Sequence, residues 1–113
     1  MATTLDHISA DELKDALASD HPPVVINTLP SEAHRARHIP GSINIPVDHI
    51  DEVEDLIPFK DERIVVYCAN ASCEASPKAA RELESMGYTN VVDFEDGYTG
   101  WRRAGYSLVG EDV

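Results

Sequence analysis

The sequence contains little cysteine, little basic charge and no long apolar run. Two cysteines in 113 residues are too few for a disulfide-stapled fold, and a chain of this length can bury an ordinary hydrophobic core as one domain. No apolar run approaches the roughly 18 residues of a membrane span. The acidic N-terminus has no basic region before an apolar stretch, as a signal peptide would. We therefore expect one domain over residues 1–113, without a membrane segment, in the cytoplasm.

Basic residues are also scarce. Nine Lys and Arg stand against 21 Asp and Glu, which gives a formal charge of −12. Nucleic acids and anionic membranes attract basic patches, so we expect neither as a partner. The acidic excess itself favours solubility. A high-salt habitat or a basic protein partner would also account for it.

Short apolar strands alternate with helical patterns along the chain. Strands are expected at 24–26, 42–46, 62–67 and 90–94, and helices at 8–19, from 31, at 47–57, at 76–88 and within 97–106. Ser9 and Glu12 have the spacing of a capping box. Ser76 is the predicted cap of the helix at 76–88, with Pro77 at its first position and Gly87 just past its end. This alternation predicts an α/β fold in which a parallel sheet has helices on both faces.

Cys68 comes directly after the strand at 62–67, where ligands bind in open α/β sheets. The loop leads into a helix N-terminus, whose free N–H groups favour a thiolate and would lower the pKa of the thiol. Ala69, Asn70, Ala71 and Ser72 are small enough for the loop to curl around one sulfur. The alternative is an inert cysteine packed at a strand end.

Several stretches resemble a single rhodanese domain: "VVYC", "SPKAARELESMGYTNVVDFEDGYTGWRRAGY", "RHIPGSINIP" and "ISADELKDAL". The resemblance covers nearly the whole chain. It implies a rhodanese-like α/β fold over residues 1–113, with a roughly five-stranded parallel sheet and helices on both faces.

The resemblance also implies a sulfurtransferase or persulfide carrier that needs no cofactor and no metal. Cys68 would be the catalytic nucleophile. It would take sulfane sulfur from a small donor such as thiosulfate or a persulfide and pass it to a protein thiol or another thiophilic acceptor. The loop after Cys68 would bind the substrate through Ala69, Asn70, Ala71, Ser72, Cys73, Glu74, Ala75 and Ser76.

The loop departs from the family pattern. Cys73 and Glu74 stand where the family has Arg followed by Ser or Thr, the loop is about two residues longer, and Asn27 and Leu29 replace a "D.R" pair. Without a guanidinium, capture of dianionic thiosulfate should weaken, which favours a thiol acceptor over cyanide. Cys73 is a candidate resolving thiol, which would form a disulfide with Cys68; a small loop filler is the alternative.

Two further functions stay open. A rhodanese fold can act as a non-catalytic binding or redox-sensing module. Arsenate reductase or phosphatase-like oxyanion chemistry would suit a longer loop, but it requires a loop Arg that the sequence lacks.

Five other residues are candidates for a role near the site. His34 and His38 have a metal-ligand spacing, but a structural role in the "HIPG" turn is the ordinary one, and no metal site is expected. Arg35 and Arg37 either face solvent or supply positive charge near the pocket. Trp101 is expected to pack against the last strand.

Overall fold

A computed structural model describes residues 6–113, so the first five residues of the predicted domain lie outside the described residues. The strands are β1 (Asp6–His7), β2 (Val24–Asn27), β3 (Ile43–Asn44), β4 (Ile64–Tyr67) and β5 (Val91–Phe94). The helices are α1 (Ala10–Leu17), α2 (Ser31–Ala36), the 3₁₀ helix η1 (Val47–Glu52), α3 (Val53–Leu56), α4 (Ala75–Ser85) and α5 (Gly97–Arg103). Within residues 6–113, no helix is long and apolar enough to cross a membrane.

All five strands form one parallel sheet in the order β1-β5-β4-β2-β3. The strand before Cys68, β4, is therefore the middle strand. Its pairing with β5 places Val66 beside Asp93 and Tyr67 beside Phe94. The predicted five-stranded parallel sheet is confirmed.

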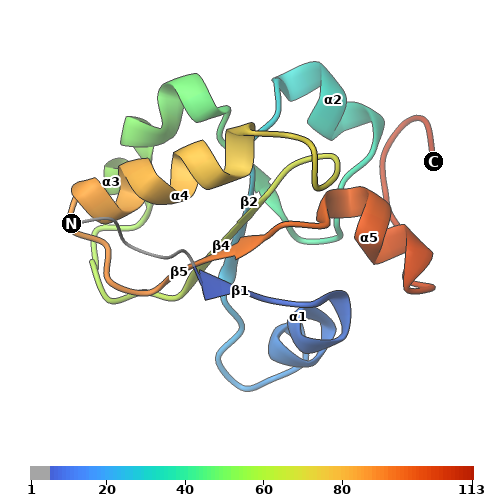
Figure 1. Ribbon diagram of the computed structural model, residues 1–113, viewed down its shortest axis with the longest axis horizontal. Helices are drawn as coiled ribbons and strands as arrows, with labels where there is room; N and C mark the ends of the chain where they lie inside the picture. Colours follow the sequence, from blue (N-terminus) through green and yellow to red (C-terminus); the bar gives the residue numbers. More distant parts are fainter. Residues whose placement is uncertain (1–5) are drawn as a thin grey trace.

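Helices cover both faces of this sheet (Figure 1). Successive strand residues point to opposite faces. Ile64 and Val66 of β4 accordingly pack with α4 and η1, while Val65 and Tyr67 pack with α1 and α5. A strand that is buried on both faces requires the continuous apolar run that "IVVY" provides. The prediction of helices on both faces is thus confirmed.

The capping pattern in the sequence correctly predicts the start of α1, but the predictions for residues 47–57, for β1 and for the start of α4 are wrong. Ser9 Oγ accepts from Glu12 N (3.1 Å), and Glu12 Oε1 accepts from Ser9 N (3.0 Å), which completes the predicted capping box. Residues 47–57 do not form one helix, because the chain kinks at His49 and only the short α3 follows η1. The two-residue strand β1 was not expected.

The third failure concerns α4, which begins at Ala75 rather than at Pro77. Glu74 is its N-cap residue, and its side chain makes no capping bond. Ser76 is therefore inside the first turn, and Pro77 follows it in that turn, where a missing N–H is tolerated. The expected positive φ after the helix is present at Gly87 (+102°). The helix thus starts two residues before the predicted cap and first position, Ser76 and Pro77, which frees the Ser76 hydroxyl from a capping role.

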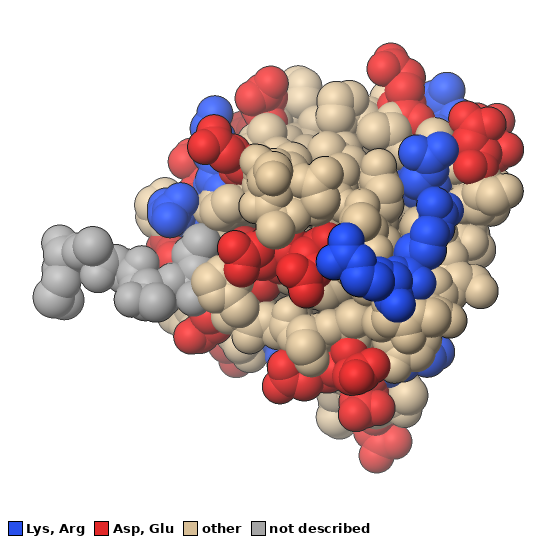
Figure 2. Space-filling view, turned by 45° about the vertical axis from the view of Figure 1, so that its right-hand side comes forward, with Lys and Arg blue, Asp and Glu red and all other residues tan. Residues whose placement is uncertain are grey.

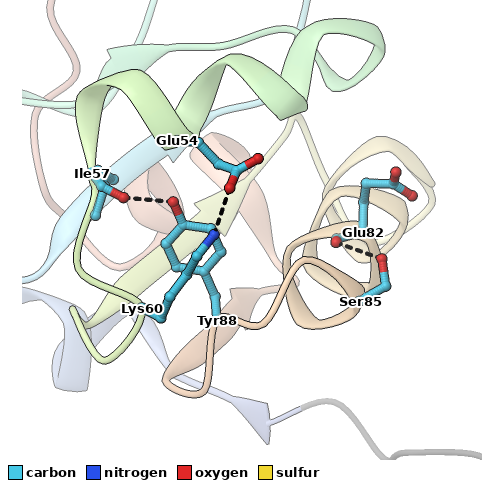
Figure 3. Close-up of polar contacts among 6 residues, drawn as sticks. All are labelled: Glu54, Ile57, Lys60, Glu82, Ser85 and Tyr88. Atoms are coloured by element: carbon cyan, nitrogen blue, oxygen red, sulfur yellow. Dashed lines mark hydrogen bonds and ion pairs between the residues drawn. The ribbon is translucent and has the colours of Figure 1, made fainter.

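A polar cluster ties the loops at the amino ends of β4 and β5 (Figure 3). Lys60 Nζ lies 2.8 Å from Glu54 Oε2 and 4.2 Å from the centre of the Tyr88 ring. The Tyr88 hydroxyl donates to Ile57 O (2.5 Å). Beside this cluster, Ser85 Oγ donates to Glu82 O (2.8 Å) within the last turn of α4. These contacts hold the end of the sheet remote from Cys68.

Candidate active site

Cys68 lies at the carboxyl edge of the sheet, immediately after the central strand. Its side chain is fully buried. Of the other predicted loop residues, Asn70, Ala71, Ser72 and Glu74 are exposed, and Ala69, Cys73 and Ala75 are half-buried. Ser76 is buried, with 1% of its surface exposed. The loop therefore covers Cys68 with residues that themselves face solvent.

The start of α5 fixes the backbone at Cys68. Tyr98 N donates to Cys68 O and Thr99 N donates to Ala69 O, both at 3.0 Å. This close approach requires a glycine at position 97, where φ is +63° and a Cβ would lie only 2.4 Å from Cys68 O. The "DGYTG" turn thus positions the nucleophile candidate through the main chain.

The loop folds on Asn70 rather than around the sulfur. Asn70 Oδ1 accepts from Ser72 N (2.9 Å), and Asn70 O accepts from Cys73 N (3.1 Å). Two of the amides expected to converge on Cys68 are therefore used within the loop, and that part of the predicted cradle is wrong. Ser76 instead contacts the sulfur: the Cys68 thiol donates to Ser76 Oγ (3.5 Å). The Cys73 side chain and the Ser76 amide also interact with it.

Burial first, and then the neighbouring Cys73 side chain, raise the pKa of the Cys68 thiol to about 11. The Ser76 hydroxyl and amide act in the opposite direction. The lowered pKa expected from the helix N-terminus is thus wrong, because a dipole near a helix end stabilises a charge by only about 0.3–1 kcal/mol. Loss of water around a fully buried thiolate outweighs that contribution.

The structure brings the two cysteines together. Both are free thiols, and the half-buried Cys73 is close enough to Cys68 to affect its pKa. The role of Cys73 as a resolving thiol stays a prediction.

Tyr67 anchors the neighbouring turn to the sheet. Its buried hydroxyl accepts from Ile39 N (3.0 Å) and Asn27 Nδ2 (3.1 Å) and shares a hydrogen bond with Ser42 Oγ (2.8 Å). Burial raises the pKa of the Tyr67 hydroxyl, which keeps it protonated. Asn27, which stands where the family has an acidic residue, thus has a structural role as a donor to the Tyr67 hydroxyl.

The two histidines are engaged with each other and with the backbone. Their rings stack at 3.9 Å, His38 Nδ1 lies 2.6 Å from His34 O, and His34 Nε2 lies 3.3 Å from Ser42 O. Burial and the nearby His38 lower the pKa of His34. These contacts match the structural role considered for the "HIPG" turn.

Of the two predicted arginines, Arg37 lies beside Tyr98, whose main chain contacts Cys68. Its guanidinium lies 5.9 Å from the centre of the Tyr98 ring, and Tyr98 N is bonded to Cys68 O. Arg35 is exposed. On the side of the molecule where α5 comes forward, Lys and Arg side chains gather in one band (Figure 2). Positive charge is therefore locally concentrated on a chain that is acidic overall.

Sequence reasoning missed Asp93. This carboxylate lies inside β5 and is 1% exposed, and its Oδ1 has no hydrogen-bond partner within residues 6–113. Burial raises the pKa of Asp93, and the Ser76 side chain acts in the opposite direction. A signal was present, because an acidic residue interrupts the apolar run "NVVDF". Buried carboxylates are rare unless they are paired.

The fold and the site define a class: parallel α/β proteins with a candidate reactive cysteine in the loop between the central strand and the next helix. The chain belongs to the rhodanese-like domain family, whose model matches residues 9–104. Its fold resembles that of a rhodanese-related protein from Thermoplasma volcanium, with a TM-score of 0.77 and 27% identity over 94% of this chain and 99% of that one.

Two curated relatives are similar in sequence. The HTH-type transcriptional regulator Rv0324 of Mycobacterium tuberculosis is 38% identical over 82 residues, which are 72% of this chain and 35% of that protein. The adenylyltransferase and sulfurtransferase uba4 of Ogataea parapolymorpha is 32% identical over 89 residues, 79% of this chain and 22% of that protein. The chain thus spans about a third or less of these two relatives, and its homologues include a sulfurtransferase.

Proposed function

We propose that this chain is a rhodanese-like sulfurtransferase or persulfide carrier in which Cys68 holds the transferred sulfur. The observation that carries this proposal is the place of Cys68 at the end of the central strand, with the Ser76 hydroxyl 3.5 Å from its sulfur. A relative named as a sulfurtransferase supports it. The proposal takes residues 1–113 as one rhodanese-like domain acting in the cytoplasm.

The reaction has two half-steps at Cys68. Its ionised sulfur attacks the outer sulfur of thiosulfate, the donor's S–S bond breaks, and sulfite leaves with the electron pair. An acceptor thiolate then attacks the outer sulfur of the Cys68 persulfide and releases the Cys68 thiolate. Neither half-step needs a cofactor or a metal.

The charge around the loop favours a persulfide donor and a thiol acceptor over thiosulfate and cyanide. The loop carries an exposed Glu74 and no Arg or Lys between Cys68 and Ser76. Arg37, next to Tyr98, is the basic group that would attract an anionic donor. It lies outside the loop and so provides no bidentate fork on the transferred sulfur.

Cys73 is proposed as the resolving thiol. Its thiolate attacks the inner sulfur of the Cys68 persulfide, hydrosulfide leaves, and a Cys68–Cys73 disulfide forms. This step discharges sulfur when no external acceptor reaches the site.

The test is intact-mass analysis after incubation with thiosulfate or glutathione persulfide. The Cys73→Ala variant should gain one sulfur atom and keep it, since its resolving thiol is missing. The Cys68→Ala variant should gain none at this site. The unaltered chain should gain one sulfur transiently and then lose it as hydrosulfide, so that the final disulfide is two hydrogens lighter than the starting chain. No added sulfur in Cys73→Ala with either donor would rule out the carrier function.

A non-catalytic binding or redox-sensing module is the second candidate: burial and the raised pKa of Cys68 favour a binding module over a nucleophile, and the neighbouring free Cys73 is the disulfide partner that a sensor would need. The relative named as a transcriptional regulator supports it too. Such a module would ignore sulfur donors, while dilute hydrogen peroxide would form the Cys68–Cys73 disulfide. The same mass measurement therefore separates the two candidates.

A further inference from the structure

An apolar surface with a cavity lies at the amino edge of the sheet, at the end of β4 opposite Cys68. Two of its side chains are large, apolar and exposed: Phe59 at 71% and Leu56 at 62%. The cavity, which we call the Phe59 cavity, has a volume of about 250 Å³. It is lined by Val24, Leu56, Ile57, Pro58, Phe59 and Glu62. Scattered apolar side chains are ordinary on a surface, but neighbouring ones around a cavity mark an interaction site.

The loop that carries Phe59 is held in place by the polar cluster of Figure 3. On one side of Phe59, the backbone oxygen of Ile57 accepts from the Tyr88 hydroxyl. On the other side, the side chain of Lys60 is bonded to Glu54. The cavity is therefore already formed in the free chain, so little ordering of this loop opposes binding.

Negative charge surrounds the Phe59 cavity. Residues 51–63 contain six acidic side chains and two basic ones. Within residues 6–113, ion pairs engage only Glu52 and Glu54 of the six. The acidic side chains outside these ion pairs are Asp51, Asp55, Asp61 and Glu62. An occupant that covers the apolar surface must therefore bring positive charge to its rim.

The shape and the charge of the Phe59 cavity together define one kind of occupant. We propose that the cavity docks a basic segment of a partner protein, which inserts one large apolar side chain beside Leu56 and Phe59 and sets Lys or Arg against the carboxylates around them. A volume of about 250 Å³ suits a single side chain, because cavities that hold small ligands span about 300–1,000 Å³. The docking needs no sulfur chemistry and is independent of the proposed function.

The same carboxylates argue against other occupants. A second copy of this chain would bring its own acidic residues against them, and like charges across an interface oppose association. An anionic membrane would be repelled for the same reason. At physiological ionic strength charges are screened over about 8 Å, so the carboxylates at the cavity, rather than the total charge of −12, decide what docks there.

The position of the Phe59 cavity leaves the Cys68 loop uncovered. The strand between them, β4, has four residues, which separates the two edges of the sheet by about 13 Å. A partner held at the amino edge therefore does not block the carboxyl edge, and the two surfaces can be tested separately.

The test selects binders to the full chain from a phage-displayed library of random dodecapeptides at physiological ionic strength. The selected peptides should carry one Trp, Phe or Leu flanked by Lys or Arg. Phe59→Ser should weaken their binding roughly thirtyfold, as loss of a central aromatic contact does. Glu62→Gln should weaken it roughly twofold to fivefold, and added salt should weaken it as well.

Two matched controls separate docking from general attraction to an acidic chain. Val113→Ser removes an apolar side chain that is 61% exposed elsewhere, and Glu111→Gln neutralises an exposed carboxylate outside the cavity. Neither should change the binding. Selected peptides without basic residues, or a selection that yields none dependent on Phe59, would overturn the proposal. Sedimentation that shows a dimer of the unaltered chain and a monomer of Phe59→Ser would also overturn it, because the occupant would then be a second copy.

Discussion

Replacing Gly97 by Ala tests how the site is held. A Cβ at this position would lie 2.4 Å from Cys68 O and 2.6 Å from Ala69 C, and both atoms belong to the main chain. Neither can move away as a flexible side chain would. The substitution should push α5 away from the start of the loop and break the hydrogen bonds from Tyr98 N and Thr99 N.

The magnitude follows from two contributions. An Ala in the left-handed region costs about 1–2 kcal/mol, and each of the two lost hydrogen bonds costs about 1 kcal/mol. We therefore expect Gly97→Ala to lower the free energy of unfolding by about 3–4 kcal/mol. For a domain near this size, that corresponds to a drop in Tm of roughly 12–16 °C.

Gly105→Ala is the matched control, because φ is +96° there and no atom lies within 4 Å of the added Cβ. This variant should lose only the conformational part, about 1–2 kcal/mol. Urea denaturation followed by circular dichroism measures both, and intact mass after sulfur loading measures the site. Equal destabilisation of the two variants, with equal sulfur uptake, would refute the claim that this contact positions Cys68.

Three further predictions concern charge, pH and anchoring. Arg37→Ala should raise the KM for thiosulfate roughly fivefold at low salt, about 1 kcal/mol, whereas Arg35→Ala should not; steady-state rates with both variants check this. Because burial raises the pKa of Asp93, its protonated form is favoured in the fold. The contribution of Asp93 to the free energy of unfolding should be complete below about pH 4 and should be lost as the pH rises through its pKa in the folded protein. The loss is about 1.4 kcal/mol for each unit by which folding raises that pKa. Urea denaturation across pH should show this loss in the unaltered chain but not in Asp93→Asn. Tyr67→Phe should lower the free energy of unfolding by about 2–4 kcal/mol, since it leaves two buried donors without their acceptor, and the same denaturation assay would contradict this if the change were below about 1 kcal/mol.

Most of the fold follows from local patterns. The run "IVVY" is apolar at every position, so its burial on both faces and its central place in the sheet were predictable. The capping box at Ser9 also follows from spacing alone. By contrast, β1 has two exposed residues, so no periodicity marks it. Only its pairing with β5 makes it a strand.

The chemistry of the site was less predictable because it depends on contacts between distant segments. The place of Cys68 follows from the end of one strand, but the pKa of its thiol depends on how closely the loop and α4 cover it. The effect of the Ser76 side chain on the pKa of Asp93 depends on the register of β4 and β5 and on where α4 begins. A two-residue error in that helix start assigned the Ser76 hydroxyl to a cap rather than to the sulfur.

The sheet order has a consequence for synthesis on the ribosome. The edge strand made first pairs with the strand made last, and the main chain of Cys68 is held by a segment some thirty positions further on, from Gly97 to Thr99. When a nascent chain ends at β4, neither β5, which pairs with β4, nor α5, which holds the main chain of Cys68, has been made. The thiol therefore stays in an unformed environment until residues 97–99 have emerged, and a product that stops before them would expose it without the surroundings that control its reactivity.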